Sequence, residues 1–126
     1  MQSGFKHPQV FADLLAFCQA YYPLHSGFPK PFRFTLGERI LQEIAEALRH
    51  IVLANAADKG SGAGRRQGAA HLKEVRAGLE VIRGYLLLAW KLRFLSHAAI
   101  TELETRLEGI SKQTARWQQW FERTGA

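Results

Sequence analysis

The basic residues of this 126-residue chain are concentrated in one segment. Residues 59–93 contain eight Lys or Arg side chains but only two acidic ones, Glu74 and Glu80, and therefore hold the whole net charge of +6. On either side of this segment, acidic and basic residues are equal in number. A cationic segment in an otherwise neutral protein indicates a polyanionic partner, most simply the phosphates of a nucleic acid. The candidate nucleic-acid or partner-binding residues are Arg65, Arg66, Lys73, Arg76, Arg83, Lys91 and Arg93.

The residue patterns that support catalysis or metal binding are lacking. The five histidines lie in different segments, and none forms an i,i+4 pair or a Cys/His set. The glycines of residues 60–64 are not followed by Lys-Ser/Thr, and no strand is expected before them, which excludes a P-loop. Glu102, Glu104 and Glu108 lie near basic residues, which favours exposed salt bridges over a general acid and base. We therefore expect no enzyme activity, no catalytic residue, no metal site and no cofactor.

Cysteine usage and hydropathy indicate a soluble cytoplasmic protein. Cys18 is the only cysteine, so no internal disulfide can form. The first residues lack the charged and apolar regions of a secretory signal. The longest apolar run, residues 85–90, is far too short to cross a bilayer, and no association with membranes is expected. The length fits a single domain over residues 1–126.

The spacing of apolar residues predicts an all-α protein. Helices are expected at about residues 8–22, 36–57, 69–95 and 97–123. Pro23 is expected to end the first helix and Ser96 to cap the last, while Thr35 and Glu38 have the spacing of a capping box at the start of the second. Because the connections before the third and fourth helices are short, neighbouring helices should be antiparallel. The predicted fold is an antiparallel up-down four-helix bundle.

Two segments between these helices are expected to be irregular. Residues 23–34 contain Pro29 and Pro31, whose preceding residues disfavour helix, so this segment is predicted to be an extended connector. Residues 59–68 contain four glycines and no apolar anchor, which predicts a flexible loop.

The third predicted helix has apolar residues on two opposite faces. Residues from Leu72 to Trp90 repeat at helical spacing on one face. The opposite face carries Val81, Tyr85, Leu88, Leu92 and Leu95. A lone small bundle needs one apolar face on each helix, so we assign the second face to an interface between copies of the chain. The alternative is that Phe28, Phe32 and Phe34 of the connector cover it.

A polar strip separates the two apolar faces. It consists of Lys73, Arg76, Glu80, Arg83 and Lys91, which share one side of the helix at i,i+3 and i,i+4 spacing. In a ring of subunits the strip would become a continuous cationic band that binds phosphates without reading base sequence. The alternative is a solvated face whose charges only keep the oligomer soluble.

Aromatic residues gather near the end of the last predicted helix. Trp117 and Phe121 continue its apolar heptad and are predicted to lie in the core. Trp120 has two interpretations: it packs against the core, or it stacks on nucleic-acid bases beside Arg116 and Arg123.

Residues 28–40 read Phe-Pro-Lys-Pro-Phe-Arg-Phe-Thr-Leu-Gly-Glu-Arg-Ile. This segment resembles the FPK..RFTLG.RI signature of the accessory variability determinant (Avd) family of diversity-generating retroelements. That family shares a superfamily with the four-helix-bundle proteins encoded in 23S rRNA intervening sequences. The residues that match the signature are Phe28, Pro29, Lys30, Arg33, Phe34, Leu36 and Gly37. Pro31 and Phe32 depart from the polar pair that is more usual there. At Gly37 the missing side chain leaves room for another backbone or an aromatic ring to approach.

The resemblance implies a homopentameric barrel of four-helix bundles with a strongly positive surface. Proteins of that family bind a reverse transcriptase and its template RNA, support mutagenic retrohoming, and have no enzyme activity of their own. By position, Arg76, Arg83 and Lys91 match the family's exposed cationic residues. The expected partners are therefore a reverse transcriptase, RNA or an RNA–DNA hybrid, and other copies of the chain in a homopentamer. Two alternatives stay open: a bundle of the rRNA intervening-sequence type, and a helical protein-interaction scaffold that binds no nucleic acid.

Overall fold

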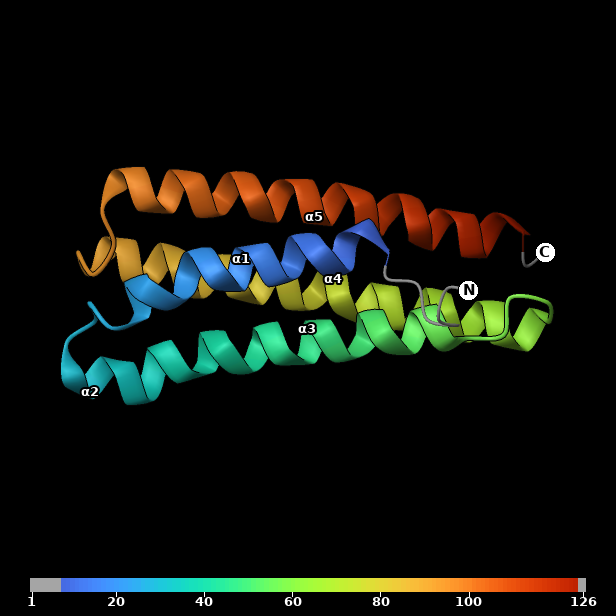
Figure 1. Cartoon of the computed structure of the whole chain (residues 1–126), viewed down its shortest axis with the longest axis horizontal. Helices are drawn as coiled ribbons and strands as arrows, with labels where there is room; N and C mark the ends of the chain where they lie inside the picture. The colour runs from blue at the N-terminus through green and yellow to red at the C-terminus, as the bar shows by residue number, and fades with distance from the viewer. Residues whose placement is uncertain (1–7, 125–126) are drawn as a thin grey trace, which may run out of the picture.

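Long helices pack side by side in a bundle-like arrangement (Figure 1). The structure, a computed structural model, describes residues 8–124. The long helices are α1 (Gln9–His25), α3 (Glu38–Ala56), α4 (Gly62–Lys91) and α5 (His97–Thr124). A short helix, α2 (Lys30–Phe32), and a π-helical turn, η1 (Arg33–Gly37), lead directly into α3. Residues 8–124 contain no strand, which confirms the prediction of an all-α chain.

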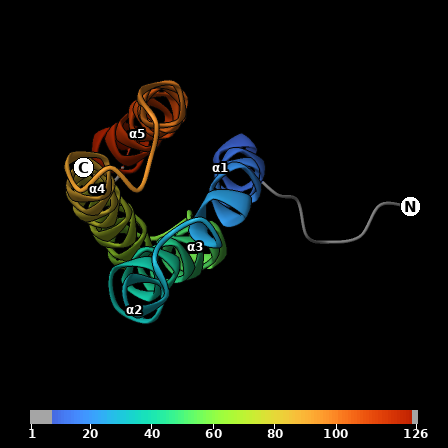
Figure 2. The ribbon, with the colours of Figure 1, turned by 90° about the vertical axis from the view of Figure 1, so that its left-hand side faces the viewer.

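Successive long helices run in opposite directions (Figure 1). Helix α4 packs against both α3 and α5. Helix α1 also packs against α3 and α5, across the bundle from α4 (Figure 2). The core lies where the four long helices meet, and each contributes residues at heptad-like spacing, such as Leu14 and Phe17 of α1 and Leu79 and Ile82 of α4. Burying each such side chain contributes about 1.5–3 kcal/mol before the cost of ordering it. Over the described part of the chain, no helix is both long and apolar enough to cross a membrane.

The segment predicted to be an extended connector is mostly helical. Helix α1 continues through Pro23 to His25, and helical backbone resumes at Lys30 and runs to Ala56. Pro23 removes one backbone hydrogen bond from the last turn of α1, but the hydroxyl of Tyr21 donates to the carbonyl oxygen of Gly37 and so ties the end of α1 to η1. Thr35 lies inside the helical run, where its Oγ1 donates to the carbonyl oxygen of Pro31 at 3.1 Å. The predicted capping box is therefore wrong.

The segment predicted to be a flexible loop, residues 59–68, mostly forms the first turns of α4. The N–H of Gly64 donates to Oγ of Ser61 at 3.0 Å, so Ser61 caps the helix and α4 starts at Gly62. Gly64 and Gly68 are buried, and a Cβ at Gly68 would lie 2.5 Å from the ring of Phe121. The glycines therefore allow close packing, whereas composition alone indicates flexibility.

Helix α4 ends at Lys91, four residues before the predicted end. The N–H of Phe94 donates to the carbonyl of Ala89 and the N–H of Arg93 to that of Trp90, which is the hydrogen-bond pattern of a Schellman motif. Arg93 has a φ of 68°, in the left-handed region that this motif requires. Helix α5 then begins as predicted, because Oγ of Ser96 accepts a hydrogen bond from the N–H of Ala99 at 3.0 Å.

Candidate nucleic-acid interface

Helix α4 carries six of the seven basic residues predicted to bind a partner, and Arg93 follows in the turn after it. The exposed ones are Arg66, Lys73, Arg76, Lys91 and Arg93, and the half-buried ones are Arg65 and Arg83. The structure thus places the cationic segment on one helix, along most of its length.

Arg83 is held by two carboxylates of α5. Its Nη2 donates to Oε1 of Glu108 at 3.0 Å, and its Nε lies 3.6 Å from Oε1 of Glu104. Burial alone lowers the pKa of Arg83, but the hydrogen bond to Glu108 and the charges of Glu80, Glu104 and Glu108 outweigh that effect and raise it. Its positive charge is therefore balanced inside the protein. The predicted polar strip is interrupted at its middle, because its most enclosed cation already has anionic partners.

Two more of the basic residues contact side chains of α5. The guanidinium of Arg65 lies 4.6 Å from the ring centroid of Trp120, a cation–π contact. Arg76 donates from Nη1 to Oε1 of Gln118 at 3.1 Å. The amide of Gln118 does not offset the charge of Arg76, and Trp120 is half-buried against the core with Arg65 over one face of its ring. Packing therefore describes Trp120 better than an open base-stacking platform does.

A cationic surface remains at the amino-terminal half of α4, which we call the basic end and define by Arg65, Arg66, Lys73 and Arg76. Within residues 8–124, the side chains of Arg66 and Lys73 form no ion pair or hydrogen bond. Their charges are available to bind phosphate groups, and exposed cations of this kind contact the nucleic-acid backbone rather than the bases.

The second apolar face of α4 is only partly exposed. Val81, Leu88 and Leu92 are 42%, 45% and 43% exposed, while Tyr85 is half-buried against the core. Leu95 is 5% exposed, so its assignment to an interface between copies is wrong. The Schellman turn after Lys91 reverses the chain and directs Leu95 into the core.

The aromatic residues of the connector do not cover this apolar face. Phe28 and Phe32 pack on Phe94, with ring centroids 5.5 and 4.8 Å apart, and Phe34 is 68% exposed. The exposed aliphatic side chains of α4 therefore lack the intramolecular cover that the alternative interpretation required.

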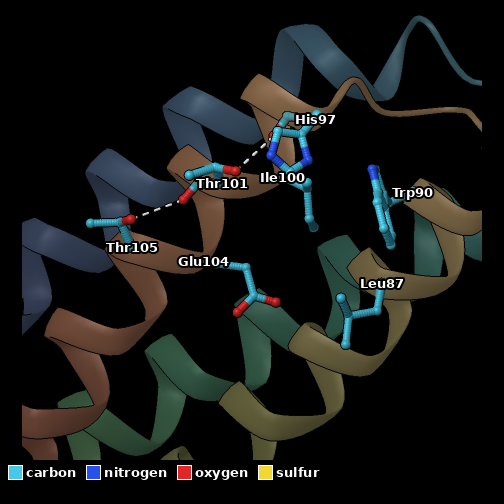
Figure 3. Close-up of a pocket in the computed structure, with 7 residues that line it drawn as sticks. All are labelled: Leu87, Trp90, His97, Ile100, Thr101, Glu104 and Thr105. Carbon is cyan, nitrogen blue, oxygen red and sulfur yellow. Dashed lines mark hydrogen bonds between the residues drawn. The ribbon is translucent and has the colours of Figure 1, made fainter.

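A cavity of about 300 Å³ lies between the end of α4 and the start of α5 (Figure 3). It is lined by Leu87, Trp90, His97, Ile100, Thr101, Glu104 and Thr105. Trp90 was predicted to lie in the core, but Ala89 takes that position and Trp90 is exposed beside the cavity. The hydroxyls of both threonines donate to backbone carbonyls of their own helix, and Glu104 contacts Arg83. Because these three polar side chains already have partners, and Leu87, Trp90 and Ile100 supply apolar surface, the cavity suits an apolar side chain.

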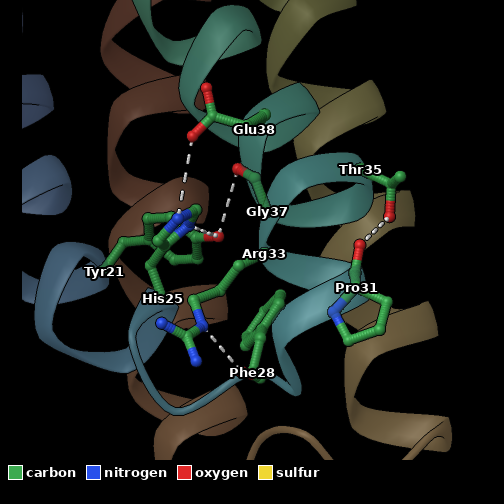
Figure 4. A network of polar contacts seen from close by, with 8 residues as sticks. All are labelled: Tyr21, His25, Phe28, Pro31, Arg33, Thr35, Gly37 and Glu38. Carbon is green, nitrogen blue, oxygen red and sulfur yellow. Dashed lines mark hydrogen bonds and ion pairs between the residues drawn. The ribbon is translucent and has the colours of Figure 1, made fainter.

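The residues that match the family signature join α1 to α3 (Figure 4). The hydroxyl of Tyr21 lies 3.2 Å from Nδ1 of His25 and 3.4 Å from the carbonyl oxygen of Gly37, and Nε2 of His25 lies 3.8 Å from Glu38. Burial raises the pKa of Tyr21, and the charges of Glu38 and Cys18 add to this. A Cβ at Gly37 would lie 2.5 Å from the His25 ring, so the predicted close approach of an aromatic ring at Gly37 is confirmed.

Other signature residues hold the turn or face solvent. Nε of Arg33 donates to the carbonyl oxygen of Phe28 at 3.1 Å, while Phe28 and Leu36 are buried. Pro29, Lys30 and Phe34 are exposed. The signature therefore combines a structural corner with an exposed surface at the end of the bundle opposite the basic end.

His50 and His71 form a pair that sequence spacing did not indicate. Their Nδ1 atoms lie 3.0 Å apart across the contact between α3 and α4. Burial lowers the pKa of His71, and the charges of His50 and Arg49 add to the effect, against Glu74, so the neutral form of His71 is favoured. Only the register between the two helices could have revealed this pair, because the residues are 21 positions apart.

No protein-family model, curated protein or solved structure matches this chain.

Proposed function

We propose that this protein is a non-enzymatic, cytoplasmic accessory protein of the Avd type. In this proposal it binds RNA or an RNA–DNA hybrid together with a reverse transcriptase, and it supports mutagenic retrohoming. Copies of the antiparallel up-down four-helix bundle form a homopentameric ring. The resemblance of residues 28–40 to the family signature suggests the class of protein, and the charge on α4 supports it independently.

The observation that carries the proposal is the basic end. Arg66 and Lys73 are exposed and have no acidic partner within residues 8–124, and the guanidinium of Arg76 donates to the uncharged amide of Gln118. A surface that leaves its cations without carboxylates gains free energy when phosphates replace the counterions around it. Repeated in each subunit, such surfaces would form a wide contact for a nucleic-acid backbone.

The exposed aliphatic side chains of α4 support self-association. Val81 and Leu88 lie on the same helix as the basic end, in its other half, and Leu92 follows directly after that helix. Removing apolar area from water contributes roughly 25 cal/mol per Å², which favours a partner surface over solvent at this position. A ring held by these residues would keep each basic end at a fixed distance from the next.

The mechanism proposed is scaffolding. A ring that binds template RNA at its basic ends and polymerase elsewhere turns the meeting of the two into an event within one complex. The effective concentration of one partner near the other then rises without any new chemical step.

The test is filter binding of a retroelement template RNA and an unrelated RNA of equal length over a series of salt concentrations. The Arg66→Glu/Lys73→Glu variant should lose roughly tenfold or more in affinity and show a shallower salt dependence. The matched control is Arg39→Glu/Arg49→Glu, which makes the same charge change at exposed residues of α3. A salt-independent response, or equal losses in both variants, would contradict the proposal and favour the protein-interaction scaffold.

A further inference from the structure

His50 of α3 and His71 of α4 are placed to act together. Their Nδ1 atoms are 3.0 Å apart, their ring centroids are 5.2 Å apart, and the rings are inclined by 37°. Both side chains are half-buried, so solvent reaches the pair. The two residues belong to different helices, and any ligand shared by them would link α3 to α4.

The tautomers of the two imidazole rings decide whether both Nδ1 atoms can bind a metal ion. A hydrogen bond between two Nδ1 atoms requires one ring to carry its proton there and the other to present a lone pair. If the donor ring instead carries its proton on Nε2, both Nδ1 lone pairs become available. Two nitrogens that bind one tetrahedral zinc ion at about 2.0–2.1 Å lie roughly 3.3 Å apart, close to the observed separation.

Carboxylates line a cavity beside His50. A cavity of about 250 Å³ between α3 and α4 is lined by His50 together with Glu43, Glu46 and Glu74. Glu46 lies one turn before His50, and Glu74 lies three residues after His71, so each carboxylate shares a helix face with an imidazole. Their negative charge favours a cation in this cavity, in contrast to the basic end of α4.

We propose that His50 and His71 chelate a divalent first-row transition-metal ion of the kind imidazole prefers, such as Zn²⁺ or Ni²⁺. Among residues 8–124, no group of three or more His, Cys, Asp or Glu side chains is arranged to hold a metal ion. The site is therefore a two-imidazole chelate whose remaining positions water fills. The metal ion would fasten α3 to α4, and this role is independent of the proposed function.

The experiment uses the full chain without a histidine tag, freed of metal by a chelator, and titrated calorimetrically with ZnCl₂ and with NiCl₂. One ion should bind per chain, and the midpoint of thermal unfolding should rise with metal concentration. His50→Asn and His71→Asn should each weaken binding roughly tenfold or more. The double variant should lose no more than either single variant, because one chelate is broken in all three.

The controls are His97→Asn, which removes a histidine near the far end of α4, and Cys18→Ser, which removes the thiol. Both should bind zinc as the parent protein does. Far-ultraviolet circular dichroism in chelator shows whether each variant is folded before metal is added. Absence of binding at millimolar metal would overturn the proposal. Full binding by the double histidine variant, or loss of binding in either control, would also overturn it.

Discussion

The two halves of α4 are built from the same kinds of residue but present different surfaces. In the first half, Arg66 and Lys73 are exposed without an acidic partner in the described chain. In the second half, Arg83 is bound by Glu104 and Glu108, and the exposed side chains include aliphatic ones such as Leu88 as well as the cation Lys91. The difference arises from α5, which supplies the carboxylates of Glu104 and Glu108 to Arg83 in the second half of α4 and the uncharged amide of Gln118 to Arg76 in the first half.

This contrast shows that a run of basic residues is not by itself a binding surface. The charge of an arginine is available to a ligand only if no carboxylate of a neighbouring helix compensates it. We therefore propose that the first half of α4 binds nucleic acid and that the second half mediates self-association, and the following predictions test that division.

The largest effect is expected for the Leu88→Asp/Leu92→Asp variant. Charged side chains on the exposed apolar face should weaken self-association by about a hundredfold or more, which is roughly 2.7 kcal/mol. Sedimentation velocity over a range of concentrations measures the change. Leu15→Asp on α1 is the control, because Leu15 is 43% exposed, as Leu92 is. Equal dissociation in the control would show that the second half of α4 is not the interface.

Glycine-to-alanine changes in the two halves of α4 should change the free energy of unfolding in opposite directions. A Cβ at Gly68 would lie 2.5 Å from the Phe121 ring, so Gly68→Ala should destabilise the protein by about 1–3 kcal/mol. A Cβ at Gly84 would have nothing within 4 Å, so Gly84→Ala should stabilise it by about 0.5–1 kcal/mol. Urea unfolding of both variants gives the two free energies. A stabilising Gly68→Ala would mean that α4 does not pack on Phe121 as described.

Neutralising one cation in each half of α4 should distinguish a cation that binds RNA from one that forms ion pairs within the protein. Lys73→Gln should weaken RNA binding severalfold and reduce the slope of log affinity against log salt by about one. Arg83→Gln should change RNA affinity less than about twofold, because its charge is already compensated by Glu104 and Glu108. Filter binding at several salt concentrations measures both. If Arg83→Gln reduced the salt slope as much as Lys73→Gln, the two halves would not differ in the way proposed.

The smallest effect is expected from removing the ion pairs of Arg83 with α5. Glu104→Gln/Glu108→Gln should cost about 0.5–1 kcal/mol of stability, since partly exposed ion pairs contribute little. The same change frees the charge of Arg83, so RNA affinity should rise about twofold to threefold. Glu102→Gln, which removes the partner of Arg106 elsewhere on α5, is the control. Unchanged RNA affinity in the double variant would show that the carboxylates of Glu104 and Glu108 do not limit RNA binding by α4.

The two segments expected to be irregular both became helical, for different reasons. In residues 23–34, Pro29 and Pro31 lie at the N-cap and in the first turn of α2, where a helix tolerates proline, and the corner is held by contacts such as that of Tyr21 with the backbone of Gly37. In residues 59–68, Gly68 belongs to a helix that packs on Phe121. The ring of Phe121 occupies the space that a side chain at position 68 would need. Local composition could not distinguish flexibility from close packing, because the deciding atoms belong to another helix.

The sequence alone determined the helical class, the approximate helix positions, the cap at Ser96 and the concentration of charge in residues 59–93. These features depend on spacing along one chain segment, and an α-helix converts such spacing directly into a face. Only the tertiary structure decided that Arg83 is compensated, that Leu95 is buried, and that His50 meets His71. Each of these depends on which side chain of a second helix lies opposite, and the register between packed helices is set by the core as a whole.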